Sequence, residues 1–169
     1  MNTRIQEIVD ALDLKPHPEG GFYKETYRSE GEINSDSLTE NYTGIRNYST
    51  CIYFMLTSGN FSAFHRIIQD EIWHFYEGST ISLHTISKEG NYQKIAIGKN
   101  FSKGEVPQYV VRGGDWFAAE IEANNAYALV GCTVSPGFDF EDFELTPRQE
   151  LLKLFPQHKA IITRLTHNS

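Results

Sequence analysis

Apolar positions recur with a helical period near the start of the chain. Residues 3–14 carry an apolar stripe formed by Ile5, Ile8, Val9 and Leu12. This stripe predicts an amphipathic helix over residues 3–14. Thr3 and Gln6 have the spacing of a capping box at its start, and the Pro- and Gly-rich residues 15–21 break it.

Farther along, the pattern changes to short β-branched and aromatic runs separated by turns. We expect strands over residues 22–28, 48–57, 61–68, 71–77, 80–87, 92–97, 107–112, 115–121, 126–135 and 138–145. The Ser- and Asn-rich segment 30–44 is expected to be a mobile surface loop. So many short strands at close spacing favour an antiparallel sandwich or barrel.

A second helical signal lies near the end of the chain. Thr146 is expected to cap a short helix with Pro147 in its first turn. Its apolar face consists of Leu151, Leu152 and Phe155. Residues 159–165 are compatible with a final strand. Since no repeat or linker interrupts the pattern, we predict one all-β domain over residues 1–169, flanked by two short helices.

Composition and charge exclude several classes of function. The net charge of the 169 residues is −7, which argues against nucleic acid as a partner, because phosphates are neutralised by clustered Lys and Arg. The apolar runs fall far short of the roughly 20 residues that span a bilayer, and no signal-peptide core opens the chain. We expect a cytoplasmic protein without membrane contact, with Cys51 and Cys132 as buried free thiols.

A histidine and a glutamate flank one expected turn. On regular alternation one strand face carries Phe61, Ala63, His65 and Ile67, and after the turn Glu71, Trp73 and Phe75. If that face is interior, His65 and Glu71 meet inside an apolar cavity. Each is costly there unless it pairs or meets a ligand. We predict this pair as the centre of a binding site, with a hairpin-pinning pair as the alternative.

Other polar residues leave alternatives open. His74 lies on the outer face unless a bulge turns it inwards. On strand 22–28, alternation puts Lys24 and Arg28 on one face, where Arg28 can hold a carboxylate, a phosphate or a sugar hydroxyl, or remain an ordinary surface residue. We expect His84 to be a satisfied core or interface histidine.

Several segments together resemble the small one-domain cupins grouped as predicted sugar epimerases. The first carries the spacing Gly-x5-His-x-Ile-x3-Glu-x6-Gly of a first cupin motif, from Gly59 to Gly78. The others are residues 16–21, 27–29, 52–56, 112–117 and 136–143. The resemblance implies a cupin jelly roll, often a homodimer that exchanges N-terminal strands.

Metal-binding cupins supply three histidines and a glutamate. By this resemblance Ile67 stands at the second histidine and Trp116 at the histidine of the second motif. Only His65 and Glu71 remain, and two protein ligands are too few for a tight transition-metal site. We therefore expect no metal and no other cofactor, with a metal enzyme using His65, Glu71 and His74 as the alternative.

Metal-free sugar-nucleotide 3,5-epimerases are the functional model that the resemblance offers. It implies His65 as the catalytic base, oriented by Glu71, with Arg28 or Lys24 beside the enolate. A tyrosine acid would return the proton, and no motif selects among Tyr27, Tyr53, Tyr76, Tyr109 and Tyr127. The aromatic residues expected to stack on a sugar or nucleobase are Trp73, Phe75 and Trp116.

The predicted function is therefore a small-molecule-binding cupin, with metal-independent isomerase or epimerase activity on a sugar or sugar nucleotide. A binding module without turnover is the alternative outside enzymes. We expect a homodimer.

Overall fold

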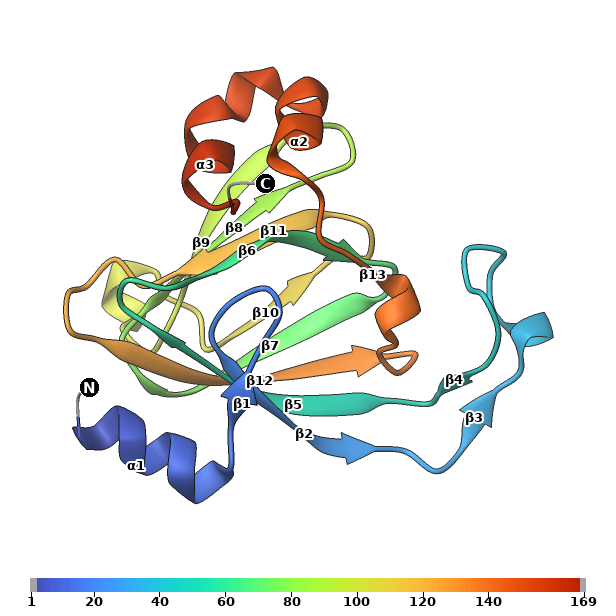
Figure 1. Cartoon of the computed structure of the whole chain (residues 1–169), viewed down its shortest axis with the longest axis horizontal. Helices are drawn as coiled ribbons and strands as arrows, with labels where there is room; N and C mark the ends of the chain where they lie inside the picture. Colours follow the sequence, from blue (N-terminus) through green and yellow to red (C-terminus); the bar gives the residue numbers. More distant parts are fainter. Residues whose placement is uncertain (1–2, 168–169) are drawn as a thin grey trace.

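Two antiparallel sheets face each other in the computed structural model, which describes residues 3–167 (Figure 1). The first sheet runs in the spatial order β1 (Lys15–Pro16), β2 (Phe22–Arg28), β5 (Thr50–Thr57), β12 (Tyr127–Ser135), β7 (Asp70–Gly78) and β10 (Gln108–Val111). The second runs β13 (Phe143–Glu144), β6 (Phe61–Ile67), β11 (Trp116–Glu120), β8 (Ile81–Ile86) and β9 (Tyr92–Ile97). This architecture confirms the predicted all-β jelly roll.

The helices cover the outer faces of the two sheets. Helix α1 (Thr3–Leu12) packs on the first sheet, and α2 (Arg148–Leu154) and α3 (Lys159–Arg164) pack on the second (Figure 1). Short 3-10 turns follow the chain at η1 (Ser35–Ser37), η2 (Phe101–Lys103), η3 (Phe140–Asp142) and η4 (Pro156–His158). No helix within residues 3–167 is long and apolar enough to cross a membrane.

A small ribbon of β3 (Glu32–Ile33) and β4 (Arg46–Asn47) stands apart from the two sheets. With η1 it forms the arm that projects to the right in Figure 1. The segment expected to be only a loop, residues 30–44, thus contains part of this ribbon and one helical turn.

Three expectations about the C-terminal third are wrong. Only Phe143–Glu144 of the strand expected over 138–145 pairs with another strand, because η3 occupies the residues before it and the Asp139 carboxylate accepts from the Glu141 amide there. Residues 159–164 are helix α3, since Ile162 and Leu165 pack with Leu151 of α2 on the second sheet. Thr146 is not a side-chain cap; its hydroxyl donates to Glu144 and accepts from the Trp116 indole.

The main core fills one end of the space between the sheets. Its largest fully buried members are Phe54, Leu56, Trp73, Phe117, Ile81, Leu83 and Ile97. A second cluster lies under the C-terminal helices and a third under α1. Cys132 is a buried free thiol, as expected, whereas the free thiol Cys51 is only partly buried.

A bulge in β6 changes which of its side chains point into the molecule. His65 pairs with Phe117 of β11, but Ser62 pairs with Ala119, so β6 has one extra residue between them. Ser62 and His65 consequently reach the same buried partner, the carboxylate of Glu19. The regular face expected for Phe61, Ala63, His65 and Ile67 is therefore wrong.

A second bulge changes the face of β2. Glu25 pairs with Ile52 of β5 and Tyr27 pairs with the preceding Cys51, so that Thr26 is the extra residue. Arg28 is thereby moved onto the face of Tyr23 and Glu25, which looks into the space between the sheets.

Candidate active site

A cavity of about 460 Å³ opens between the sheets at the end that the main core leaves unfilled. Strands β2, β5, β6, β7 and β12 supply its walls, and the loop before β2 and the segment around η3 complete it. Its lining residues are His17, Glu19, Tyr23, Glu25, Arg28, Thr50, Ile52, Phe54, His65, Ile67, Glu71, Trp73, Cys132, Val134, Phe138, Asp139, Phe140 and Phe143. The volume lies in the lower part of the range of about 300–1,000 Å³ usual for small-molecule pockets.

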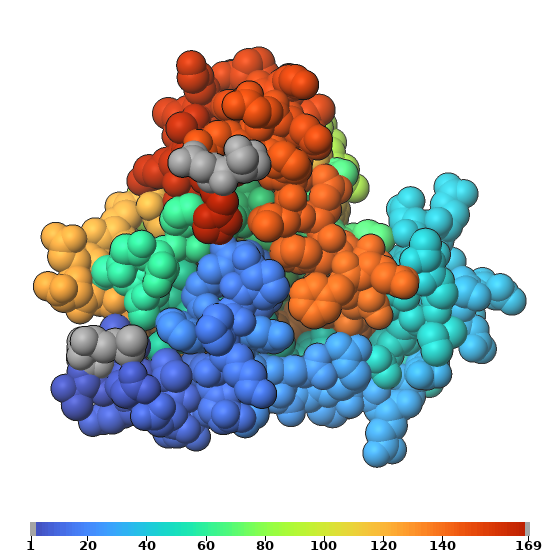
Figure 2. Space-filling model, in the orientation of Figure 1, coloured from blue at the N-terminus to red at the C-terminus, as the bar shows by residue number. Residues whose placement is uncertain are grey.

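The loop before β2 inserts Glu19 between the sheets. Gly20 has φ +116°, and a Cβ there would lie 2.0 Å from the backbone oxygen of Phe61, so only glycine permits this approach. The Glu19 carbonyl accepts a hydrogen bond of 2.9 Å from the Ala63 amide in the β6 bulge. In Figure 2 the blue residues of this loop lie in the middle of the visible face, beside the orange segment that follows β12.

His65 is held as a charged imidazolium. Its Nδ1 lies 2.7 Å from the Ala63 carbonyl oxygen, which only accepts, and its Nε2 lies 2.9 Å from a Glu19 carboxylate oxygen. Burial alone would lower the pKa of His65, but the Glu19 carboxylate and the Ala63 carbonyl raise it above its ordinary value. Both ring N–H groups are therefore engaged by the protein, and His65 has no free lone pair with which to act as a base.

Glu71 is the cavity group poised to exchange a proton. Burial raises its pKa to about 7; the His65 cation opposes this rise and the Glu19 carboxylate adds to it. The thiol of Cys132 and the indole of Trp73 lie near the carboxyl and favour its charged form only weakly. No ion pair to Glu71 is found among residues 3–167. A carboxyl that is half ionised near neutral pH suits general acid–base chemistry.

His17 adds a neutral imidazole to the same cavity. Its Nδ1 accepts from the Glu19 amide at 3.3 Å, so the proton of the neutral ring is on Nε2. Burial lowers the pKa of His17, with the Glu19 carboxylate opposing and the His65 cation assisting. Within the described part of the chain Nε2 has no hydrogen-bond partner, which leaves its N–H available to a ligand.

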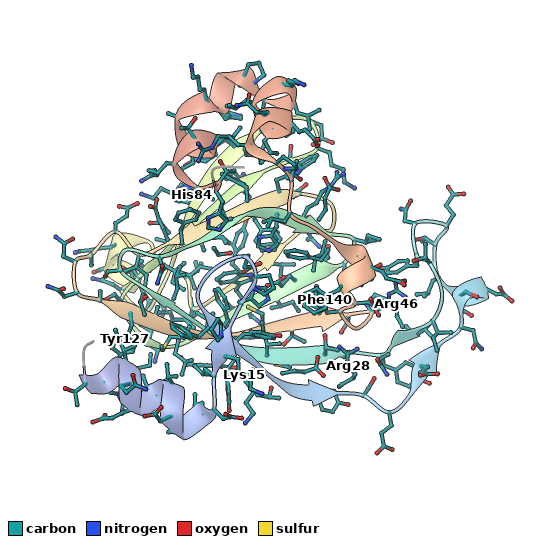
Figure 3. The ribbon with its side chains drawn as sticks, viewed as in Figure 1. Lys15, Arg28, Arg46, His84, Tyr127 and Phe140 are labelled. Carbon is teal, nitrogen blue, oxygen red and sulfur yellow. The ribbon has the colours of Figure 1, made fainter. Side chains whose placement is uncertain are left out.

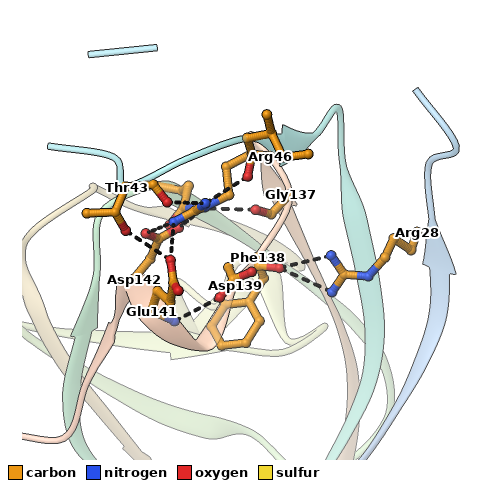
Figure 4. Close-up of polar contacts among 10 residues, drawn as sticks. Arg28, Thr43, Arg46, Gly137, Phe138, Asp139, Glu141 and Asp142 are labelled. Atoms are coloured by element: carbon orange, nitrogen blue, oxygen red, sulfur yellow. Dashed lines mark hydrogen bonds and ion pairs between the residues drawn. The ribbon is translucent and has the colours of Figure 1, made fainter. Parts of the chain in front are cut away.

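Arg28 lines the cavity mouth, but its hydrogens are already in use. The guanidinium donates to both oxygens of Glu25 at 3.0 and 2.8 Å, to the Asn47 amide oxygen at 2.8 Å, and twice to the Phe138 carbonyl at 3.1 Å. These bonds account for all five N–H groups of an arginine. Figure 4 shows Arg28 reaching across to Phe138 of the segment that covers the cavity.

That covering segment, residues 137–143, is fastened by a buried ion pair. Arg46 forms a two-point contact with Asp142, at 2.7 and 2.6 Å, and the Gln69 amide donates to the same carboxylate (Figure 4). Both charged side chains are at most 3% exposed. Arg46, Arg28 and Phe140 gather at one end of the molecule, as Figure 3 shows.

Of the residues predicted for the site, the cavity brings together His65, Glu71, Arg28 and Trp73. Four others lie elsewhere. Because of the β2 bulge, Lys24 and Arg28 lie on opposite faces of the strand. The Lys24 Nζ lies 3.5 Å from a carboxylate oxygen of Asp13. Phe75 belongs to the main core beyond the cavity.

His74 and Trp116 also lie outside the cavity, since both point to the outer faces of their sheets. Pairing of β7 is regular from Asp70 to Phe75, so no bulge turns His74 inwards, and its ring bonds to Thr133. Trp116 packs against Phe155 under the helices. The inward position beside His65 belongs to Phe117, whose ring centroid is 4.0 Å from that of His65.

Glu19, His17 and Tyr23 are among the lining residues that sequence reasoning did not assign to the site. The Glu-Gly-Gly run was a usable signal for Glu19, because two glycines permit a close approach of the chain. None of the five tyrosines considered as acids lines the cavity, whereas Tyr23 does.

The residues of this cavity do not fit a metal centre of the cupin kind. Both nitrogens of His65 are bonded to the protein, and Ile67 and Phe117 occupy the neighbouring inward positions. Among residues 3–167 the group that brings three ligand atoms within 4.8 Å is His84, Glu120 and Glu122, outside the cavity. Its carboxylates already pair with Arg164 and Lys94.

Two curled sheets around an aromatic cavity with buried titratable groups define a jelly-roll protein with a small-molecule pocket. Residues 6–146 match the family described as cupin superfamily (DUF985). The chain belongs to this family.

Relatives of known structure share the fold over nearly the whole chain. A hypothetical protein from Leishmania major superposes with a TM-score of 0.88 at 34% identity, covering 96% of this chain and 98% of that one. Protein SO0799 from Shewanella oneidensis superposes with a TM-score of 0.88 at 37% identity, covering 97% of this chain and 98% of that one.

A further relative is matched by sequence. The uncharacterized yeast protein YML079W (Saccharomyces cerevisiae) is 33% identical over 162 residues, which cover 89% of this chain and 79% of the yeast protein.

A more distant likeness concerns the fold alone. Oxalate decarboxylase from Bacillus subtilis superposes with a TM-score of 0.55 at 14% identity, covering 94% of this chain and 38% of that one. At this identity the shared feature is the cupin architecture.

Proposed function

We propose that the cavity binds a small polar carbonyl compound, of the sugar class, and catalyses metal-independent proton transfer at the carbon beside its carbonyl group. The observation that carries this proposal is Glu71, a cavity-facing carboxyl whose pKa of about 7 suits a base at neutral pH. The roles differ from those expected from the sequence, in which His65 was the base and Glu71 its orienting partner.

The proposed reaction needs no external oxidant or reductant. The Glu71 carboxylate takes the proton from carbon, the C–H electron pair becomes the new C=C bond, and the carbonyl π pair moves onto oxygen. The Nε2–H of His17 is suited to donate to that oxygen, because neutral imidazole stabilises a developing oxyanion by hydrogen bonding. For a substrate with a hydroxyl group on the carbon that lost its proton, that hydroxyl passes its own proton to the enolate oxygen and becomes the new carbonyl. The enediolate electron pair then takes the Glu71 proton at the former carbonyl carbon, which gives the isomer.

His65 contributes charge rather than a proton in this scheme. Its imidazolium is bonded to Glu19 and Ala63 on both sides, so it has no hydrogen to give to the substrate, and its charge acts on the carboxyl groups around it. The same charge favours the ionised form of Glu71. We therefore assign His65 and Glu19 as positioning residues.

An epimerisation would require a second proton donor on the opposite face of the substrate. Tyr23 is the candidate, because it is a tyrosine of the cavity wall and its hydroxyl has no hydrogen-bond partner among residues 3–167. An isomerisation between neighbouring carbons requires no second carbon acid, because Glu71 removes the proton from one carbon and returns it to the other.

Solvent-deuterium exchange tests the proposal. In D₂O, with ketopentoses, ketohexoses and a 4-keto sugar nucleotide as probes, we expect deuterium at the carbon beside the carbonyl. The rate should rise with pH through an apparent pKa of about 7, since the base must be ionised. Glu71→Gln should lower the rate by about 100-fold or more, and the exposed Glu40→Gln should leave it unchanged.

Persistence of exchange in Glu71→Gln would remove Glu71 from the mechanism. Binding of a probe to the wild-type protein without exchange of any probe would favour the alternative, a binding module without turnover. The homodimer and the cytoplasmic location expected from the sequence remain part of this proposal.

A further inference from the structure

The charges that line the cavity are mostly negative. Four carboxyl groups face it, from Glu19, Glu25, Glu71 and Asp139, against two cationic groups, from Arg28 and His65. Glu19 and His65 neutralise each other at 2.9 Å, and so do Glu25 and Arg28 at 2.8 Å. The charges left for a ligand are those of Asp139 and the partly ionised Glu71.

Neither cation has a hydrogen left to donate. Arg28 uses its five N–H groups on Glu25, Asn47 and Phe138, and His65 uses both of its own on Glu19 and Ala63. A phosphate or carboxylate is bound through free charge-assisted donors. Such an anion would have to break existing bonds in this cavity.

The polar groups still free suit an uncharged partner. Besides Asp139 they include the Nε2–H of His17, the hydroxyl of Tyr23, the carboxyl of Glu71 and the indole N–H of Trp73, which has no hydrogen-bond partner among the described residues. These groups donate or accept single hydrogen bonds without supplying positive charge. The apolar walls, from Phe54, Trp73, Phe138 and Phe143 among others, offer ring faces for the C–H side of a compact ligand.

We propose that the cavity selects uncharged, sugar-sized carbonyl compounds and discriminates against their phosphorylated and nucleotide-linked forms. This inference rests on the proposed function, since it names the substrate class of the same site. The sequence led us to expect a sugar or a sugar nucleotide as the ligand, and this inference keeps only the free sugar.

Matched pairs of probes test the preference by isothermal titration calorimetry of the full chain. Fructose is compared with fructose 6-phosphate, and glucose with UDP-glucose. We expect binding of at least one neutral member, and a dissociation constant about tenfold or more higher for its charged partner. A charged member that binds as tightly as its neutral partner, or the failure of both neutral sugars to bind, would overturn the inference.

Two variants separate the local charge from the total charge. Glu25→Gln removes the anion that occupies Arg28, so the preference for the neutral member should shrink by about threefold or more as guanidinium hydrogens become free. Glu40→Gln removes the same charge from the exposed arm and should leave the preference unchanged. Equal effects of the two variants would contradict the role of Arg28.

The binding and exchange experiments fail independently. A neutral sugar that binds without deuterium exchange would reject the proposed reaction and leave the ligand class intact. A sugar phosphate that both binds tightly and exchanges would reject the ligand class and leave the reaction intact.

Discussion

The pKa values of the two innermost carboxyl groups of the cavity are shifted in opposite directions, because only one of the two has a cationic partner in contact. Burial would raise the pKa of Glu19, but the His65 imidazolium lowers it below its usual range. Glu71 has no such contact, and its pKa is raised to about 7. The first carboxyl therefore orients a charge, and the second is able to carry a proton.

The raised pKa of Glu71 predicts a stability change with pH. An unfolded glutamate ionises near 4.5 and the folded one near 7, so the native state binds more protons and the free energy of unfolding falls as pH rises between these values. The cost reaches at most about 3 kcal/mol above pH 7. Glu71→Gln removes this cost.

Urea unfolding at two pH values measures the effect. We expect Glu71→Gln to be more stable than the wild type at pH 8, and this advantage to become small at pH 5. An equal difference at both pH values would show that Glu71 ionises normally in the folded protein.

At the scale of elements, β6 and its partner loop place the charged pair. The β6 bulge directs Ser62 and His65 to one carboxylate, and the loop before β2 brings that carboxylate in through Gly20. Both features are backbone irregularities that hold side chains in place.

Gly20→Ala is expected to damage this arrangement. A Cβ would lie 2.0 Å from a backbone oxygen at φ +116°, whereas at Gly59 (φ +83°) it would meet nothing within 4 Å. Gly59→Ala should therefore cost only the left-handed strain of about 1–2 kcal/mol. Chemical denaturation compares the two variants, and equal losses would mean that the loop does not need this close approach.

The covering segment 137–143 gives a second prediction at this scale. Asp142→Asn leaves Arg46 buried without its anion, and breaking a buried pair costs about 3–5 kcal/mol. We expect faster hydrogen exchange at residues 137–143. The matched control is Glu141→Gln, whose side chain is 64% exposed and 3.7 Å from Arg46, and which should cost under about 1 kcal/mol. Similar exchange in both variants would show that the pair does not fasten the segment.

The sequence predicted most strands because alternation and turn spacing are local properties. Residues 22–28 and 92–97 coincide with β2 and β9. The bulges at Thr26 and in β6 have no residue signature, and each one reverses the face on which the later residues of its strand lie. For this reason the strand faces of Lys24 and Ala63 were predicted wrongly. Arg28 points into the cavity because the β2 bulge places it on the inner face. Glu19 and His17 lie far from His65 in sequence, so their contact depends on tertiary structure.

At the scale of the whole molecule, the cavity lies between the two sheets, and helices cover their outer faces. Helix α1 covers part of the first sheet, and α2 and α3 cover the second (Figure 1). Tyr27 and Tyr76, both on strands of the first sheet, are 55% and 41% exposed. The homodimer expected from the sequence stays a prediction.

The homodimer is tested by sedimentation equilibrium at micromolar concentration. We expect a mass of twice the 19.3 kDa of the chain. A monomeric mass across the concentration range would contradict this prediction.

Because the pKa of Glu71 is about 7, ligand binding in the cavity is coupled to proton exchange with the buffer. When a ligand favours either the protonated or the ionised form of this carboxyl, the protein takes up or releases a fraction of a proton on binding. Phosphate and Tris buffers differ in their ionisation enthalpies, so the heat of association at pH 7 will differ between them. The heat of buffer ionisation is thus part of the binding heat that calorimetry measures for this protein.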